Sequence, residues 1–271
     1  MRVLWFTNVI LPEFASRIGL AQINQNGWLS ALVEAIRVYA PGIDLTIACE
    51  GPCGNDVVID NVRFVTLGYL HWRYWRTSVD QIDLERIRQF VKEVNPDLIH
   101  LHGTEGRWVT LPECVWDARP VVASIQGVIN GCAHHYTGDL LPSEIHSFWN
   151  LPNMLLTRWS VYRGAKVWEF RLAPQEAQAF RRIRHFLGRT TWDFAWTKYL
   201  APDATYHTVG EILRRPFYDG GRNASTIVSH SIFCGAAAGY PLKGGHWLIK
   251  AVAALKDKYP DVQLRIANSQ R

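Results

Sequence analysis

The stretch SIFCGAAAGYPLKGGHWLIKAVAAL, residues Ser231–Leu255, predicts a strand, a glycine-containing loop and a helix, in that order. A short apolar run at its start leads into small residues and then into two breakers, Gly239 and Pro241. Apolar residues then recur with the spacing of one helical face, at Trp247, Leu248, Ala251, Val252 and Leu255. We therefore expect a βα unit of the kind from which parallel sheets are built.

The loop of this unit places a basic residue, Lys243, just before the expected helix. The free N–H groups and the dipole at a helix N-terminus favour an anion, and a lysine adds positive charge. An ordinary βα unit with a surface lysine explains the same spacing equally well. The spacing alone therefore leaves a phosphate site and a plain structural unit both open.

Short apolar segments alternate with amphipathic ones along the chain before this unit. We expect helices at Trp28–Tyr39 and Gln81–Val94, and a mostly helical segment over Leu156–Leu187. The expected strands are Val3–Thr7, Leu45–Cys49, Val62–Leu67, Asp97–His102, Pro120–Ile125 and Ala204–Val209, with Val262–Ala267 following the last helix. This alternation predicts an α/β fold with a doubly wound, mostly parallel sheet.

Ligands of such sheets bind outside the carboxyl ends of the strands. The loops after Thr7, His102 and Ile125 are therefore the expected rim of a cleft. A segment rich in glycine and proline, residues 214–230, reads as a linker. It divides the chain into an expected first domain of residues 1–213 and the start of a second domain at 231–271.

Composition narrows the class of protein. With 271 residues, 48% of them apolar, the chain can hold one large domain or about two, and no apolar run is long enough for a spanning helix. The net charge of +5 is modest and dispersed, which suits anionic ligands and gives no indication of nucleic-acid binding. Five irregularly spaced cysteines and the lack of a signal-peptide cleavage site indicate a reducing, cytoplasmic location without a disulfide framework.

Several of these features together resemble a GT-B glycosyltransferase, in particular the retaining group 1, or family 4, enzymes. They are Gly27-Trp28 at a helix start, PDLIHLHG at Pro96–Gly103, and the strand, loop, Lys243-Gly244 and helix of the opening stretch. The resemblance implies two Rossmann-like domains, a first acceptor-side domain and a donor-binding one. It also implies hexosyl transfer from a nucleotide-sugar donor to a glycan or lipid-linked acceptor, as in polysaccharide biosynthesis, with no cofactor and no metal.

The resemblance also implies roles for particular residues. Lys243, with Gly244, matches the position that neutralises the donor diphosphate, and Gly27 matches the loop that approaches the donor phosphates. His102, Gln126 and Glu211 fall at catalytic, cleft-lining positions. Gln126 stands where the family commonly has a histidine, and glutamine cannot titrate. Small residues, 235–238, stand where the family commonly has an arginine.

A further departure concerns the family's paired glutamates, separated by seven residues, which lie beyond Arg271. Glu85 and Glu93 have that spacing, but they belong to the expected helix Gln81–Val94, and we interpret them as a solvated helix face. The alternative to an enzyme is therefore a truncated, non-catalytic product whose first domain only binds an acceptor or a partner. In that alternative, Trp247 and Leu248 belong to an exposed apolar patch.

Two other segments have a functional and a structural interpretation. Leu70–Arg76, LHWRYWR, interleaves aromatic and basic residues, which suits contact with an anionic membrane surface or a glycan, but a surface loop with packed rings is preferred. His134-His135 reads as a polar loop in preference to a metal site, because no carboxylate or cysteine is patterned nearby. A nicotinamide dehydrogenase is disfavoured, because no GxGxxG motif follows a strand.

Overall fold

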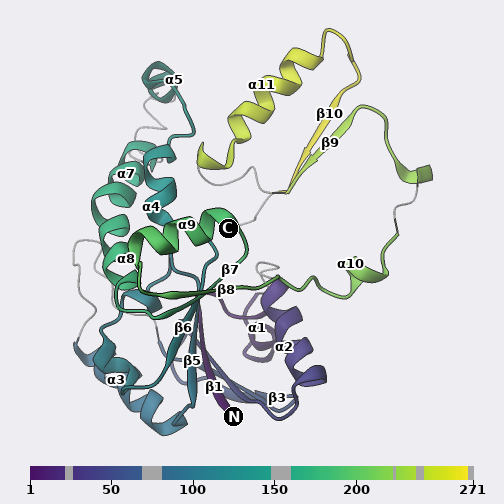
Figure 1. The fold of residues 1–271 in the computed structure, drawn as a ribbon. Coiled ribbons are helices and arrows are strands. Elements are labelled where there is room, and N and C mark those ends of the chain that lie inside the picture. The colour runs from purple at the N-terminus through teal and green to yellow at the C-terminus, as the bar shows by residue number, and fades with distance from the viewer. Residues whose placement is uncertain (22–26, 69–80, 148–159, 222–223, 236–240, 268–271) are drawn as a thin grey trace. The chain divides into compact units, whose positions relative to one another are not determined.

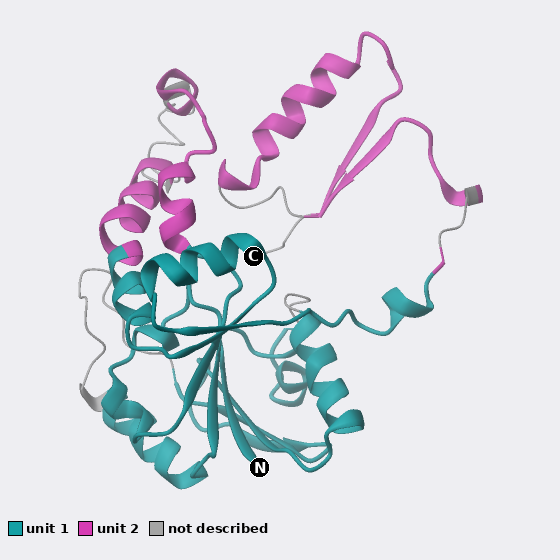
Figure 2. Ribbon diagram, in the orientation of Figure 1, with its two compact units in different colours: residues 1–128, 174–220 teal, residues 129–173, 221–271 magenta. Residues whose placement is uncertain are grey.

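The structure is a computed structural model that describes residues 1–21, 27–68, 81–147, 160–221, 224–235 and 241–267 (Figure 1). The chain divides into two compact units, which Figure 2 distinguishes by colour. Unit 1 comprises residues 1–128 and 174–220, and unit 2 comprises residues 129–173 and 221–271. The domain boundaries expected from the sequence stay a prediction.

Unit 1 is built on one sheet of eight strands, in the order β3-β4-β2-β1-β5-β6-β7-β8. All neighbours are parallel except β3 and β4, which form an antiparallel pair at one edge. The strands are β1 (Arg2–Thr7), β2 (Asp44–Cys49), β3 (Asp56–Ile59), β4 (Val62–Thr66), β5 (Leu98–His102), β6 (Val121–Ser124), β7 (His185–Gly188) and β8 (Thr205–Thr208). The predicted doubly wound, mostly parallel α/β sheet is confirmed.

Helices form a separate core on each face of this sheet. On one face, α1 (Pro12–Arg17) and α2 (Gly27–Tyr39) pack Phe14 and Leu29 against β1, β2 and β4. The opposite core is contributed by these elements: α3 (Gln81–Val94), η1 (Trp108–Thr110), η2 (Glu113–Trp116), α8 (Ala173–Phe180) and α9 (Thr191–Leu200). The central strands read as continuous apolar runs because both of their faces are buried.

Two strands of the sheet, β3 and β7, were not expected, whereas β4 matches the expected strand Val62–Leu67. β3 and β4 form a hairpin through Asp60-Asn61, and both turn residues have positive φ, 47° and 63°. Such a two-residue turn matches the twist of a hairpin, so the signal was present in the sequence. The expectation of helix up to Leu187 was wrong, because α8 ends at Phe180 and His185–Gly188 is strand β7. Pairing with β6 and β8, and stacking of Phe186 on Phe180, override the local helix propensity there.

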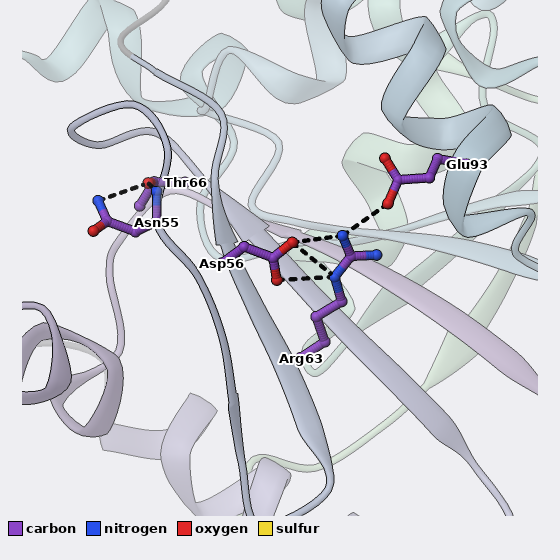
Figure 3. A network of polar contacts seen from close by, with 5 residues as sticks. All are labelled: Asn55, Asp56, Arg63, Thr66 and Glu93. Carbon is purple, nitrogen blue, oxygen red and sulfur yellow. Dashed lines mark hydrogen bonds and ion pairs between the residues drawn. The ribbon is translucent and has the colours of Figure 1, made fainter.

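The outer edge of the sheet is tied to α3 by an arginine network (Figure 3). The Nε and Nη2 atoms of Arg63 on β4 donate to Asp56 on β3 at 3.0 and 2.6 Å, and Nη2 also donates to Glu93 at 2.8 Å. Glu93 is thus an exposed helix-face residue paired with a neighbouring strand. This pairing agrees with the interpretation of Glu85 and Glu93 as a helix face.

Unit 2 contains the βα unit predicted from Ser231–Leu255. β9 (Ser231–Cys234) pairs in parallel with β10 (Gln263–Ile266), and α11 (Gly245–Leu255) connects them. The remaining helical elements of unit 2 are α4 (Ile129–Cys132), η3 (Ala133–His135), α5 (Pro142–Ser147), α7 (Ser160–Val167), η4 (Trp168–Leu172), η5 (Ala224–Thr226) and η6 (Pro241–Lys243). A short helix, α10 (Pro216–Asp219), closes unit 1 in the sequence.

Candidate functional site

The candidate site lies where the sheet of unit 1 changes direction. The chain leaves β1 toward β2 and β4 on one side, and then returns to place β5 on the other side of β1. The crevice at the carboxyl ends of two such strands is the usual ligand site of a doubly wound sheet. Asn8 follows β1 directly, and Gly103 follows β5 directly, so these residues mark the point of reversal.

Three polar side chains converge above Gly103. A Cβ atom placed on this glycine would lie 2.6 Å from Asn8 Nδ2, 3.3 Å from Glu105 Oε2 and 3.4 Å from Gln126 Oε1. Gly103 also has φ of +100°, a conformation that disfavours a side chain. We call Asn8, Glu105 and Gln126 the polar cluster. Its members come from the ends of β1, β5 and β6, and glycine at position 103 allows all three side chains to pack close to its backbone.

Asn8 is fixed within the polar cluster by both its hydrogen bonding and its packing. Its Nδ2 atom donates to the carbonyl of His102 at 3.1 Å. A Cβ atom on Gly106 would overlap the Asn8 amide, so two glycines of the β5 loop make room for this side chain. Next to it, Thr104 Oγ1 donates to the carbonyl of Gly127 at 2.7 Å, which ties the loops after β5 and β6 together. The amide of Asn8 is therefore held at a defined place at the rim.

Glu105 combines solvent access with a crowded carboxyl group. The residue is exposed, yet surrounding protein atoms withdraw its carboxyl from water and so raise its pKa above the ordinary value. The charge of Glu176 raises this pKa further, whereas backbone N–H groups of Glu105, Gly127 and Thr104 act in the opposite direction. A raised pKa at a crevice is typical of a group that exchanges protons.

A pocket of about 300 Å³ opens on the face of the sheet that carries α2. Its walls are mainly apolar, with Trp5 and Trp28 among them. Its polar lining residues are His100, Ser124, Gln126, Arg189 and Glu211. The structure thus brings together two of the predicted site residues, Gln126 and Glu211, in one pocket of unit 1.

Glu211 lies in this pocket as the partner of an arginine. Arg189, which follows β7, forms an ion pair with Glu211 and donates from Nη2 to the carbonyl of Gln126 at 3.3 Å. The backbone N–H of Arg189 donates to Asp193 at 2.9 Å, and Asp193 completes a capping box with Thr190 at the start of α9. The loops after β6, β7 and β8 are therefore joined through one guanidinium.

His102 is buried in the sheet face and is separate from the polar cluster. Its side chain is among the most buried in unit 1, with 1% of the residue exposed, and its ring lies 4.4 Å from Trp5 and 3.9 Å from His100 between centroids. Neither ring nitrogen has a hydrogen-bond partner among the described residues. Burial, and then the neighbouring His100, hold the pKa of His102 well below its usual range, so the ring is neutral.

His100 lies on the same strand face and lines the pocket. Its Nε2 atom is 2.7 Å from Ser124 Oγ. Burial lowers the pKa of His100 to about 4. Both histidines of β5 are therefore uncharged at neutral pH, and their contribution to the pocket is hydrogen bonding and shape rather than charge.

The predicted donor-binding residues lie in different units. Gly27 begins α2 of unit 1, and a Cβ atom on it would lie 2.6 Å from Nε of Arg214. Lys243 and Gly244 belong to unit 2, where exposed Lys243 ends η6 and Gly244 caps α11 with φ of +75°. The left-handed conformation at Gly244 favours glycine there.

Three further predictions concerned a metal site at His134-His135, the segment Leu70–Arg76 and membrane-spanning helices. His134 lies 3.7 Å from Glu169, and the described residues contain no group of three metal-ligating side chains. Leu70–Arg76 lies outside the described residues. Within the described part of the chain, no helix has the length and apolar character needed to cross a membrane.

Sequence reasoning did not single out Asn8 or Glu105. The available signal was positional, because both residues stand in loops directly after expected strands, at the predicted rim of the cleft. The sequence predicted that these two loops and the loop of Gln126 belong to one rim, but it did not indicate that the three side chains would meet above Gly103. Their convergence depends on the order of the strands, which places β5 between β1 and β6.

No family model and no curated protein matches the sequence. Among solved structures, the chain is similar over its whole length to sucrose-phosphate synthase from Thermosynechococcus elongatus, with a TM-score of 0.51 and 12% identity. It spans 64% of the length of that neighbour. The chain is also similar over its whole length to Glycyrrhiza uralensis UGT73P12 complexed with glycyrrhetinic acid 3-O-monoglucuronide, with a TM-score of 0.40, 11% identity and 69% of that chain covered.

The likeness to the first of these structures concerns the fold. It supports a Rossmann-like α/β architecture of the GT-B kind, which is consistent with the large, mostly parallel sheet of unit 1.

Proposed function

We propose that this chain acts in glycosyl transfer, moving a sugar from a nucleoside-diphosphate sugar to a glycan or lipid-linked acceptor, with retention and without a metal. One observation carries the proposal. The polar cluster of Asn8, Glu105 and Gln126 lies at the switch point of a GT-B-like sheet, where doubly wound folds bind their ligands. The apolar pocket beside it is suited to the non-polar part of an acceptor.

The donor side of the proposal rests on Lys243 and Gly244. The departing nucleoside diphosphate gains negative charge as the glycosidic bond breaks, and a lysine beside a helix N-terminus stabilises such charge. Lys243 ends the turn before α11, and Gly244 caps that helix. In the same proposal, Gly27 permits close approach of the α2 N-terminus to the donor.

The acceptor side of the proposal belongs to residues 1–213, with 214–230 as the linker and 231–271 as part of the donor domain. Gln126 and Glu211 contribute polar groups to the pocket of unit 1. In this proposal His102 acts indirectly. Its neutral ring packs against Trp5 and His100, and these two residues line the pocket. The burial of His102 favours a positioning role over direct contact with a substrate.

The first experiment is a turnover assay with a panel of nucleotide sugars and a mixed set of glycan and lipid-linked acceptors. Release of nucleoside diphosphate, together with an acceptor mass increased by one sugar, is the expected result. Lys243→Ala is expected to lower kcat by about 10²-fold or more, as for loss of one charge-stabilising group. Lys256→Ala, at the opposite end of α11, is the matched control and is expected to keep wild-type turnover. Absence of transfer with every donor contradicts the proposal.

A second candidate function is binding without catalysis. It is favoured by the exposure of large apolar residues in unit 2, where Phe233 is 73%, Ile249 57% and Trp247 50% exposed. Exposed patches of this kind mark contact surfaces. In this case the chain binds an acceptor but no nucleotide-sugar donor. The amide hydrogens of residues 231–267 are then expected to exchange rapidly with solvent. Saturable binding of a nucleotide sugar by the chain would exclude this candidate.

A further inference from the structure

The pocket of unit 1 has walls and polar groups that favour one class of ligand. We propose that it binds a compact, uncharged aromatic alcohol, whose ring contacts Trp5 and Trp28 and whose hydroxyl bonds to Ser124. Every residue that lines the pocket belongs to unit 1. The inference goes beyond the proposed function, because such binding is measurable without a sugar donor. Within that function, the ligand is the acceptor or its non-polar end.

Aromatic rings from two elements form part of the pocket wall. Trp5 belongs to β1 and Trp28 to the first turn of α2, and both line the pocket. The ring of buried His102 packs against both indoles, with centroid distances of 4.4 Å to Trp5 and 5.6 Å to Trp28. This packing holds the indoles in place before a ligand arrives, which lowers the cost of binding. An aromatic ligand gains ring-to-ring contacts with such a wall, whereas an alkyl chain gains only burial.

A neutral hydrogen-bonding pair lies in the wall that the sheet contributes. Ser124 Oγ on β6 is 2.7 Å from His100 Nε2 on β5, and both residues line the pocket. Burial lowers the pKa of His100 to about 4, so the ring is uncharged at neutral pH. The serine oxygen has two lone pairs, and His100 uses at most one of them in either tautomer. A ligand hydroxyl can therefore donate to Ser124 Oγ.

Two charged side chains of the lining are paired with each other. Arg189 and Glu211 both line the pocket and form an ion pair. Because these side chains neutralise each other, a charged ligand gains little from either of them, and it loses hydration against the apolar wall. An uncharged ligand does not bear this cost.

The volume of the pocket favours a compact ligand. It measures about 300 Å³, which is the lower limit of small-molecule sites that span about 300–1,000 Å³. A fused pair of aromatic rings suits this size, whereas a long polyprenyl chain extends beyond it. The volume therefore favours an aromatic alcohol over a long-chain lipid.

The test measures binding of 2-naphthol to the full chain by equilibrium dialysis, with no sugar donor present. Three further probes each change one property, because naphthalene lacks the hydroxyl, 2-naphthoate carries a charge and 1-octanol replaces the rings by a chain. We expect saturable binding of 2-naphthol and weaker binding of the other three. For naphthalene the affinity should be lower by about 3- to 10-fold, as for loss of one neutral hydrogen bond.

Variants locate the ligand in the pocket. Leu32→Trp enlarges a lining residue of α2 and is expected to abolish 2-naphthol binding. Val38→Trp is the matched control, because exposed Val38 lies on the same helix and is not a lining residue. Ser124→Ala is expected to weaken 2-naphthol binding by about 3- to 10-fold and to leave naphthalene binding unchanged. Unfolding midpoints are measured alongside, and Ser124→Ala keeps the test decisive if Leu32→Trp folds poorly.

The outcomes separate this inference from the proposed function. Absence of saturable 2-naphthol binding, or undiminished binding in Leu32→Trp, would overturn the inference. Tighter binding of 1-octanol would assign the pocket to an alkyl chain, and tighter binding of 2-naphthoate would assign it to an anion, so either result overturns the proposed class. Unchanged 2-naphthol binding in Ser124→Ala, or an equal loss for naphthalene, would overturn the hydrogen bond to Ser124. None of these results decides whether sugar is transferred, and absence of transfer leaves the binding results standing.

Discussion

The side-chain amide of Asn8 donates a 3.1 Å hydrogen bond to the carbonyl oxygen of His102, and this bond joins the ends of β1 and β5 at the reversal of the sheet. The same strand end is held from the other side, because Trp108 Nε1 donates to the carbonyl of Thr7 at 2.9 Å. The rim of the candidate site is therefore fixed by side chains that bond to strand-end carbonyls. Changes at this rim should alter both stability and function.

Gly103→Ala tests the packing of this rim. The added Cβ atom would meet Asn8 Nδ2 at 2.6 Å, and alanine would have to adopt φ of +100°. We expect a loss of about 2–4 kcal/mol in the free energy of unfolding, from backbone strain and the weakened Asn8 bond. Gly42→Ala is the matched control, because a Cβ atom there meets nothing within 4 Å and the backbone is not left-handed. Urea titration of both variants makes the measurement, and equal stability of the two would contradict the packing described.

The buried histidines of β5 predict a loss of stability in mild acid. Burial lowers the pKa of His100 from 6.5 to about 4, so the unfolded chain binds a proton in this range that the folded chain does not. Stability therefore rises with pH between about 4 and 6.5, and this contribution is flat above and below that window. For His100 alone the change amounts to roughly 3 kcal/mol, and His102 shifts in the same direction.

Urea unfolding at several pH values from 4.5 to 7.5 measures this dependence. His100→Gln removes one titrating group and should reduce the slope by about 1.4 kcal/mol per pH unit within the window. His135→Gln, an exposed histidine of η3, is the control and should leave the slope unchanged. An identical slope in His100→Gln and the wild type would show that His100 titrates normally in the folded chain.

The cysteines predict selective alkylation. Burial, with a smaller effect from the charge of Glu50, raises the pKa of Cys49 to about 12, whereas Cys53 and Cys114 are exposed. Because the thiolate is the reactive form, iodoacetamide at pH 8 should modify Cys53 and Cys114 and leave Cys49 intact until the chain unfolds. Peptide mass spectrometry before and after addition of urea reads out each site. Modification of Cys49 at the same rate as Cys53 under native conditions would be inconsistent with its place in β2.

The fold was largely predictable from the sequence, because strands such as β1 and β2 are buried on both faces and appear as unbroken apolar runs. β7 was not predictable in this way, since His185–Gly188 follows a segment of strong helix formers and becomes a strand only by pairing with β6 and β8. The polar cluster was missed for a related reason. Asn8, Glu105 and Gln126 are far apart in the sequence, and only the strand order brings them together.

Glu211 forms an ion pair with Arg189, so it could either contact a substrate or hold Arg189 in place. Replacing each residue singly and both together distinguishes these two roles. If Glu211 touches a substrate, Glu211→Gln should lower kcat even when Arg189 has already been replaced. If Glu211 serves to hold Arg189, then Glu211→Gln, Arg189→Met and the double variant should have similar effects, because each breaks the same link between the loops after β6 and β8. We expect the second pattern, with a coupling of about 1 kcal/mol in the free energy of unfolding, because the pair is partly exposed. A double-mutant cycle, measured by urea unfolding and by kcat, distinguishes the two, and additive losses in kcat would establish a direct role for Glu211.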